Sequence, residues 1–179
     1  ADGSVSLIRT ATFNSASWVA TGVDLGMNYR LDTDNWGQWN FKSETTYFRT
    51  NVFNGQEFIG RYSGFPNWKY RSQFNIDWSK GDWSVAYTAR YMSRLSDDGG
   101  CFLAVCSDQA NNLNFLGATT YHDLQGSWKT PWKAVVSVGA RNIFGKEPPL
   151  TANSFAHAFD ASYDLPGGAK WYASYRQDF

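Results

Sequence analysis

The chain has 179 residues, which is enough for one domain with a sizeable hydrophobic core. Sixteen Lys and Arg balance sixteen Asp and Glu, so the zero formal charge gives no electrostatic case for binding nucleic acid or an anionic membrane surface. No run of about 18 apolar residues is present, which excludes a spanning helix; a spanning barrel stays open, because its strands are apolar only at every second residue. Ala1 is not followed by the charged and then apolar segments of a secretion signal, so we expect a mature chain or a piece of a longer one.

The first predicted strand covers residues 18–30, where apolar residues such as Val23 and Leu25 alternate with polar ones. A period of two is typical of a strand, because successive side chains point to opposite faces. Residues 32–37 form a predicted turn. A second strand follows it, with Trp39 and Phe41 on one face and Lys42 and Glu44 on the other. Residues 51–67 are rich in Gly, Asn and Pro and are predicted to form a loop.

The clearest pattern is a β-hairpin over residues 68–91, with its turn at residues 79–82. One face of this hairpin is mainly apolar, and its aromatic members are Trp68, Tyr70, Phe74, Trp78, Trp83, Tyr87 and Tyr91. The other face is polar and includes the charged residues Lys69, Arg71, Asp77 and Arg90.

The spacing of two tryptophans suggests what the apolar face contacts. Trp68 and Trp78 are ten residues apart, which is roughly 33 Å along a strand and about 25 Å in height after a tilt of about 40–45°. This height matches the apolar band of an outer-membrane barrel, which has aromatic residues at both edges. The alternative is a soluble β-sandwich, in which the apolar face packs against a second sheet.

Further strands are predicted after a second loop at residues 93–117. They cover residues 121–128, 134–141 and 170–179, with a turn at 130–132 between the first two. The strand that begins at residue 134 is predicted to end at Glu147-Pro148-Pro149, because proline cannot donate a hydrogen bond to a β-ladder. Residues 154–163 also alternate weakly, and we interpret them as part of a loop hairpin rather than a spanning strand. Short and long connections therefore alternate, which places all short ones at one end of the strands, as in outer-membrane barrels.

Two cysteines, Cys101 and Cys106, lie in the loop at 93–117. With no further cysteine and no nearby histidine, metal binding is disfavoured, and a local disulfide formed in an oxidising compartment is favoured over two free thiols. The closed loop is small, so the bridge is expected to add local order more than global stability. Mass spectrometry without reductant should find the loop peptide two hydrogens lighter, whereas two alkylated thiols would contradict the disulfide.

Several motifs follow one another along the chain. They are Gly22-Val23-Asp24-Leu25 after Asn14, Pro66-Asn67-Trp68 with Trp78 and Gly81-Asp82-Trp83, Asn142-Ile143-Phe144 in the penultimate strand, a Tyr163-Asp164…Gly167-Gly168 turn, and a closing strand that ends in Phe179. Together they resemble the carboxyl-terminal part of the β-barrel of a TonB-dependent outer-membrane receptor. The resemblance covers nearly the whole chain, residues 1–179. It implies an all-β fold, namely an antiparallel transmembrane β-barrel of which this chain supplies the last seven or eight strands.

The resemblance also implies partners and a location. Family barrels have twenty-two strands, an amino-terminal plug and an energy-coupling box, and the plug and the box are not in this sequence. The expected partners are outer-membrane lipid, the rest of the barrel and its plug, the TonB protein, and the barrel-assembly machinery, which reads a carboxyl-terminal signal here at Tyr175 and Phe179. Gln177 departs from the apolar residue usual beside the terminal aromatic. The long loops would be extracellular, and the short turns and the carboxyl end periplasmic.

No catalytic constellation is convincing, and no cofactor or metal is expected. The charges expected to line the barrel lumen are Lys42, Glu44, Lys69, Arg71, Asp77, Arg90 and Arg141. Three functions stay open: part of an importer of a siderophore, cobalamin or carbohydrate; a self-contained eight-stranded outer-membrane barrel with a structural or adhesive role; and a soluble carbohydrate-binding β-sandwich. The reading frame upstream of Ala1 would separate the first from the second, and detergent dependence would separate the third from both.

Overall fold

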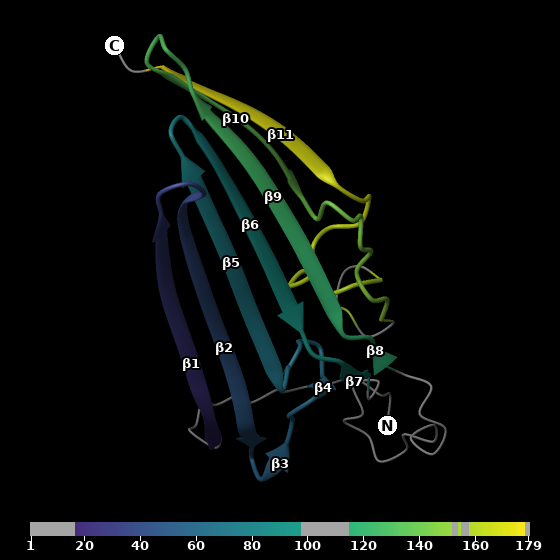
Figure 1. The fold of residues 1–179 in the computed structure, drawn as a ribbon. Coiled ribbons are helices and arrows are strands. Elements are labelled where there is room, and N and C mark those ends of the chain that lie inside the picture. Colours follow the sequence, from purple (N-terminus) through teal and green to yellow (C-terminus); the bar gives the residue numbers. More distant parts are fainter. Residues whose placement is uncertain (1–16, 98–114, 152–153, 155–157, 178–179) are drawn as a thin grey trace, which may run out of the picture.

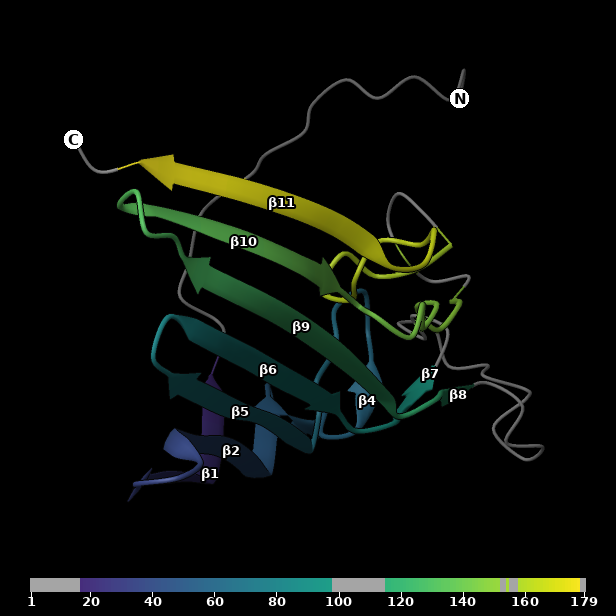
Figure 2. The ribbon, with the colours of Figure 1, turned by 45° about the horizontal axis from the view of Figure 1, so that its top comes forward.

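The computed structural model describes residues 17–97, 115–151, 154 and 158–177, and within these the fold is all-β. No helix among them is long and apolar enough to cross a membrane. The main sheet is antiparallel (Figures 1 and 2). Its strands lie in chain order: β1 (Trp18–Thr33), β2 (Gly37–Phe53), β5 (Tyr70–Lys80), β6 (Trp83–Met92), β9 (Thr119–Lys129), β10 (Ala134–Arg141) and β11 (Lys170–Gln177), with the short β3 (Gln56–Glu57) paired to the end of β2.

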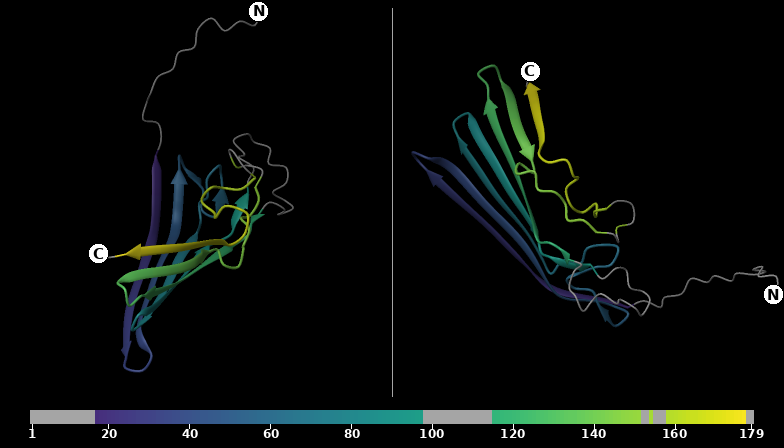
Figure 3. Two further views of the ribbon diagram at one scale, coloured as in Figure 1. Left: turned by 90° about the horizontal axis from the view of Figure 1, so that it is seen from above. Right: turned by 90° about the vertical axis from the view of Figure 1, so that its right-hand side faces the viewer.

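The main sheet is open. Its strand order runs from β1 to β11, and these two strands do not pair with each other, so each leaves one side of its backbone without a strand partner among the described residues. Figure 3 shows the result as a twisted, curved wall and not a closed barrel. The barrel predicted from the sequence is therefore seen here only as an antiparallel sheet.

The connections are sorted as the sequence predicted. Turns at residues 34–36, 81–82 and 130–133 join strands at one end of the sheet, and the carboxyl end of β11 lies at that same end (Figure 1). The three long connections, residues 54–69, 93–118 and 142–169, all begin and end at the other end of the sheet. We call these the turn end and the loop end of the sheet.

The register confirms two faces of opposite character. Phe41 lies opposite Ile76, Ile76 opposite Tyr87, and Tyr87 opposite Leu124, which makes one continuous apolar row across four strands. The adjacent row on the other side of the sheet runs through Lys42, Asn75, Thr88 and Asp123. Because the side-chain period of a strand is two, an error of one residue in any pairing would have mixed these faces.

The hairpin begins two residues later than predicted, and this corrects the position of Trp68. Its side chain is only 8% exposed and packs in the loop-end core, so it does not share the exposed apolar face with Tyr70. Its indole N–H donates to the Tyr163 hydroxyl at 3.2 Å, and the two rings meet edge to face at 5.7 Å. The height argument built on Trp68 and Trp78 is therefore wrong.

The end of β10 also differs from the prediction. The strand ends at Arg141 because Asn142 adopts a left-handed conformation, with φ of 51°, and its side-chain amide closes a turn by hydrogen bonds to both backbone groups of Lys146 at 2.8 Å. The prolines at 148–149 therefore do not terminate the strand. The Asn142-Ile143-Phe144 element lies just after this strand and not within it.

The predicted loops contain short strands of their own. A second, three-stranded sheet joins β4 (Arg61–Tyr62), β7 (Leu95–Asp97) and β8 (Phe115–Leu116) at the loop end (Figure 1). The described part of residues 154–163 forms no strand, in agreement with the loop interpretation. Cys101, Cys106 and Phe179 lie outside the described residues, so the disulfide and the terminal part of the assembly signal stay predictions.

The buried core of the described chain lies at the loop end and not beneath the whole sheet. It gathers side chains from the two sheets and from two long connections: Tyr62, Trp68, Met92, Leu95, Leu116, Tyr121 and Tyr163. Met92 and Tyr121 belong to the polar face by register, since they lie opposite Arg71 and Arg90. The core therefore covers the loop end of the polar face, whereas most of the apolar face stays exposed.

Candidate functional site

The apolar face of the main sheet is the largest exposed feature of the described chain. Val23, Leu25 and Val138, all at its apolar positions, expose 54%, 65% and 52% of their surface. The strands β4, β7 and β8 do not pair with the main sheet, and their buried side chains meet it in the loop-end core, which lies on the polar face. Soluble monomers rarely expose contiguous apolar patches larger than a few hundred Å², so a face that spans seven strands requires an apolar environment or a partner.

Tryptophans gather at the turn end of this apolar face. Trp39 lies 6.2 Å from Trp78 between ring centroids, Trp83 stacks on Trp128 at 5.8 Å, and Trp128 meets Trp132 at 5.7 Å. With Trp36, six of the nine tryptophans of the chain lie at this edge. We call this row the turn-end aromatic edge.

The loop end of the same face carries tyrosines. Tyr47 lies 4.9 Å from Tyr70 between ring centroids, and Tyr91 on β6 is 40% exposed. Tyr70 and Trp78 are eight residues apart on β5, which is about 26 Å along the strand. Between the two edges the exposed positions are mainly aliphatic, as with Val85 and Leu124.

His122 lies on the apolar face of β9, two residues before Leu124. Its ring Nδ1 is 2.6 Å from the Tyr87 hydroxyl, and Phe144 meets the ring edge to face at 4.9 Å. The ring therefore has a polar partner on its own face, so Tyr87 and His122 shield each other's polar atoms.

The polar face carries most of the predicted charges. Lys42 and Glu44 pair at 2.7 Å, and Asp77 lines a hollow of about 600 Å³ near the turn end together with polar side chains such as Asn40 and Gln125. Lys69 is an exception, because it precedes β5 and its Nζ lies 5.9 Å from the ring of Tyr47, an apolar-face residue. The prediction that Lys69 lines the polar face is wrong.

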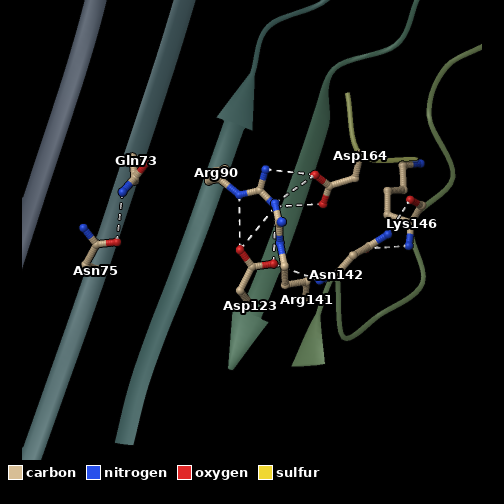
Figure 4. Close-up of polar contacts among 8 residues, drawn as sticks. All are labelled: Gln73, Asn75, Arg90, Asp123, Arg141, Asn142, Lys146 and Asp164. Atoms are coloured by element: carbon tan, nitrogen blue, oxygen red, sulfur yellow. Dashed lines mark hydrogen bonds and ion pairs between the residues drawn. The ribbon is translucent and has the colours of Figure 1, made fainter. Parts of the chain in front are cut away.

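Arg90 is the centre of an ion cluster on the polar face (Figure 4). Its guanidinium donates to Asp123 at 3.3 Å from two nitrogens and to Asp164 at 3.1 and 2.7 Å. Arg141 adds a longer contact of 3.8 Å to Asp164, whose side chain is 15% exposed. Bidentate pairing of an arginine with a carboxylate is geometrically specific, so the bonds to Asp164 fix the 142–169 connection against β6 and β9.

The cluster also organises the end of β10. The backbone N–H of Asn142 donates to Asp123 at 2.8 Å, so one carboxylate joins the arginine to the turn that ends the strand. The guanidinium carbon of Arg90 lies 5.3 Å from the ring centroid of Tyr121, at the border of the loop-end core. Arg71 stands in the same way over Trp68, at 5.3 Å. Both arginines thus connect the polar face to the core beneath the connections.

Tyrosine hydroxyls hold the connections to one another. Tyr62 is fully buried and donates to the Asp160 carboxylate at 2.9 Å. Burial and this hydrogen bond raise the pKa of Tyr62 to about 12. Burial also raises the pKa of Tyr163, and the hydrogen bond from Trp68 opposes that rise. Both hydroxyls therefore stay protonated at neutral pH, and Tyr62 keeps its donor role.

Part of this arrangement was predicted from the sequence. The sequence placed Arg71, Asp77, Arg90 and Arg141 on the polar face, and the structure agrees. It did not indicate that Asp164 and Tyr163 return to that face. Asp164 is 74 positions after its partner Arg90, and Tyr163 is 95 positions after its partner Trp68, so neither contact leaves a local sequence pattern. Asp123 could have been found, since it and Arg90 occupy polar-face positions on neighbouring strands.

The ion cluster gives a prediction for the 142–169 connection. Asp164→Asn should lower the free energy of unfolding by about 1–3 kcal/mol, because Arg90 is partly buried and loses a charged partner. Limited proteolysis should then cut this connection sooner. The control is Glu44→Gln, in a pair whose side chains are 48% and 59% exposed, which should cost less than about 1 kcal/mol. Equal protection in both variants would contradict an anchoring role for the cluster.

The described residues contain no group of three or more His, Cys, Asp and Glu placed to hold a metal ion. No protein-family model, curated protein or solved structure matches the chain.

Proposed function

We propose that this chain is the carboxyl-terminal part of the β-barrel wall of a TonB-dependent outer-membrane receptor, which imports a scarce ligand such as a siderophore, cobalamin or a carbohydrate. The observation that carries the proposal is the exposed apolar face with aromatic residues at both ends. The proposed role is transport rather than catalysis. The resemblance of the sequence motifs to that family supplies the name of the class.

The dimensions of the apolar face support a location in a membrane. The distance from Tyr70 to Trp78 becomes about 20 Å in height for a strand tilted by about 40°, and the apolar band of an outer-membrane barrel is about 25 Å tall between its aromatic girdles. Tyrosine and tryptophan favour such interfaces because one part of each ring system is apolar and another forms hydrogen bonds. In this placement the turn end is periplasmic and the loop end extracellular.

The two edges of the sheet support a place within a larger barrel. An eight-stranded barrel of this chain alone would need β1 and β11 to be joined directly or through another strand, and the described residues supply neither connection. A soluble sandwich would need a second sheet on the apolar face, and β4, β7 and β8 lie elsewhere. Additional strands from the same receptor would satisfy both edges.

The polar face then lines the lumen. It combines the Arg90 cluster with the hollow near Asp77, so its wall offers an ion cluster toward the loop end and amide side chains together with Arg30 and Asp77 toward the turn end. The plug of the receptor would contact this wall, and the TonB protein would act through that plug. Outer-membrane lipid and the assembly machinery are the other proposed partners.

The test is uptake by the complete gene product in its outer membrane. An in-frame deletion of residues 70–92 removes the central hairpin and should abolish energy-dependent uptake of one ligand from a panel of siderophores, cobalamins and oligosaccharides. The control is the intact gene in a host without TonB, which should lose the same uptake. Recovery of the intact product in the soluble fraction, or uptake that persists without TonB, would contradict the proposal.

A further inference from the structure

A groove of about 640 Å³ opens on the apolar face at the turn end. Its walls include the indoles of Trp36, Trp39 and Trp78, and Ile76 and Val85 lie between them. Trp36 comes from the turn between β1 and β2, whereas the other residues belong to β2, β5 and β6. The groove therefore forms where this turn folds over the apolar face of the sheet.

Two hydrogen bonds hold the turn in this position. The indole N–H of Trp78 donates to the backbone carbonyl of Trp36 at 2.7 Å. The ammonium group of Lys80 donates to the backbone carbonyl of Asn35, also at 2.7 Å. Trp36 itself stays 75% exposed, so it forms a wall of the groove and does not fill it. The groove is a built feature of the fold, because side chains from β5 fix the wall that faces them.

Lys80 gives the groove one charged end. It occupies an apolar-face position opposite Trp83 and lines the groove together with the three tryptophans. Among the described residues no carboxylate pairs with Lys80; the ion pairs found there involve other side chains. One ammonium hydrogen is used by Asn35, and an ammonium group has two more to donate. The groove thus joins apolar walls to a cation that forms no ion pair with a carboxylate of the described residues.

We propose that this groove binds an anionic phospholipid, with one acyl chain between the tryptophans and the headgroup phosphate on Lys80. The inference rests on the proposed membrane location, because it takes the lipid from the leaflet at the turn end. A lysine at the edge of an apolar band reaches the headgroup level, where it attracts anionic lipid. The tryptophans of the turn-end aromatic edge lie at the same level as the lipid carbonyl region. A zwitterionic lipid fits the walls equally well, but the cationic group of its own headgroup already neutralises the phosphate.

The experiment measures quenching of tryptophan fluorescence by lipids brominated near the carbonyl end of an acyl chain. The complete gene product is reconstituted into phosphatidylcholine bilayers that contain either brominated phosphatidylglycerol or brominated phosphatidylcholine. The phosphatidylglycerol should bind about fivefold more tightly at the quenched site, the preference that one lysine near a membrane surface supplies. Lys80→Gln should remove this preference, and Lys42→Gln, which removes the same charge from the polar face, should retain it.

A second variant separates the groove from the charge alone. Trp36→Ala keeps Lys80 but removes one wall, so it should weaken the preference for phosphatidylglycerol and lower the quenched fraction. Equal quenching by both lipids, or a preference that survives Lys80→Gln, would overturn the lipid site and leave the membrane face intact. Absence of quenching by either lipid would overturn the membrane location itself, and with it the proposed function.

Discussion

Replacing Tyr87 by arginine is expected to lower the free energy of unfolding in a bilayer by about 2–4 kcal/mol, the cost of arginine on a lipid-facing strand near the midplane. Tyr87 lies midway along β6, four residues from Trp83 at the turn end and four from Tyr91 at the loop end. Neither cross-strand neighbour could neutralise an arginine there, because these neighbours are Ile76 and Leu124. Urea titration of the protein in lipid vesicles, followed by heat-modifiable migration, measures the change.

Two controls assign that cost to lipid exposure. Tyr87→Phe keeps the apolar ring and loses only the contact with His122. It should therefore lower the free energy of unfolding by roughly 0.5–1.5 kcal/mol, the contribution of one hydrogen bond. Thr88→Arg introduces the same charge one residue later on the polar face, opposite Asn75 and Asp123, and should be tolerated. If Thr88→Arg costs more than Tyr87→Arg, the two faces have been assigned the wrong way round.

Alternation predicted the strands and their faces because it is a local property. From Tyr70 to Trp78 and from Trp83 to Tyr91 each side chain lies on the face that its position in the pattern indicated, and the turn at Gly81 and Asp82 is where the sequence placed it. The order of short and long connections was also readable, since it requires only the positions of strand ends. Both features depend on residues that are neighbours in sequence.

Trp68 was misplaced because the pattern extends past the residue where the strand begins. It continues the alternation of Tyr70 and Phe74, yet its partner is Tyr163, 95 residues later. A contact that distant has no local signature, and the same applies to Asp164 with Arg90 and to Asp160 with Tyr62. The loop-end core could therefore not be derived from periodicity, although Tyr62 and Tyr163 could each be seen as an aromatic residue within a predicted loop.

The end of β10 illustrates a competition between two local signals. Proline at 148 would stop a strand, but Asn142 acts earlier by adopting a left-handed conformation and hydrogen bonding to Lys146. Asparagine tolerates that conformation better than most residues, and Gly145 follows with a φ of 63°. The Asn-x-x-Gly spacing was therefore the stronger stop signal, and it was present in the sequence.

A protein limited to residues 17–179 is expected to oligomerise or aggregate when purified in detergent and to show no channel activity. The reason lies in the edges of the main sheet. β1 is 16 residues long and exposed along almost its whole length, and it pairs only with β2. In a bilayer each unpaired backbone group costs several kcal/mol, so open edges of this length do not persist there. Pairing between copies would be the accessible alternative to pairing with further strands of the proposed barrel.

Size-exclusion chromatography with light scattering measures the oligomeric state, and planar-bilayer recording measures the conductance. A longer product that supplies the strands before Trp18 is the control, and it should be monodisperse because β1 and β11 then have partners. A monodisperse monomer of the short protein with heat-modifiable migration would instead mean that β1 and β11 meet. In that case the chain would be a self-contained small barrel, since closure removes both edges and leaves no place for further strands.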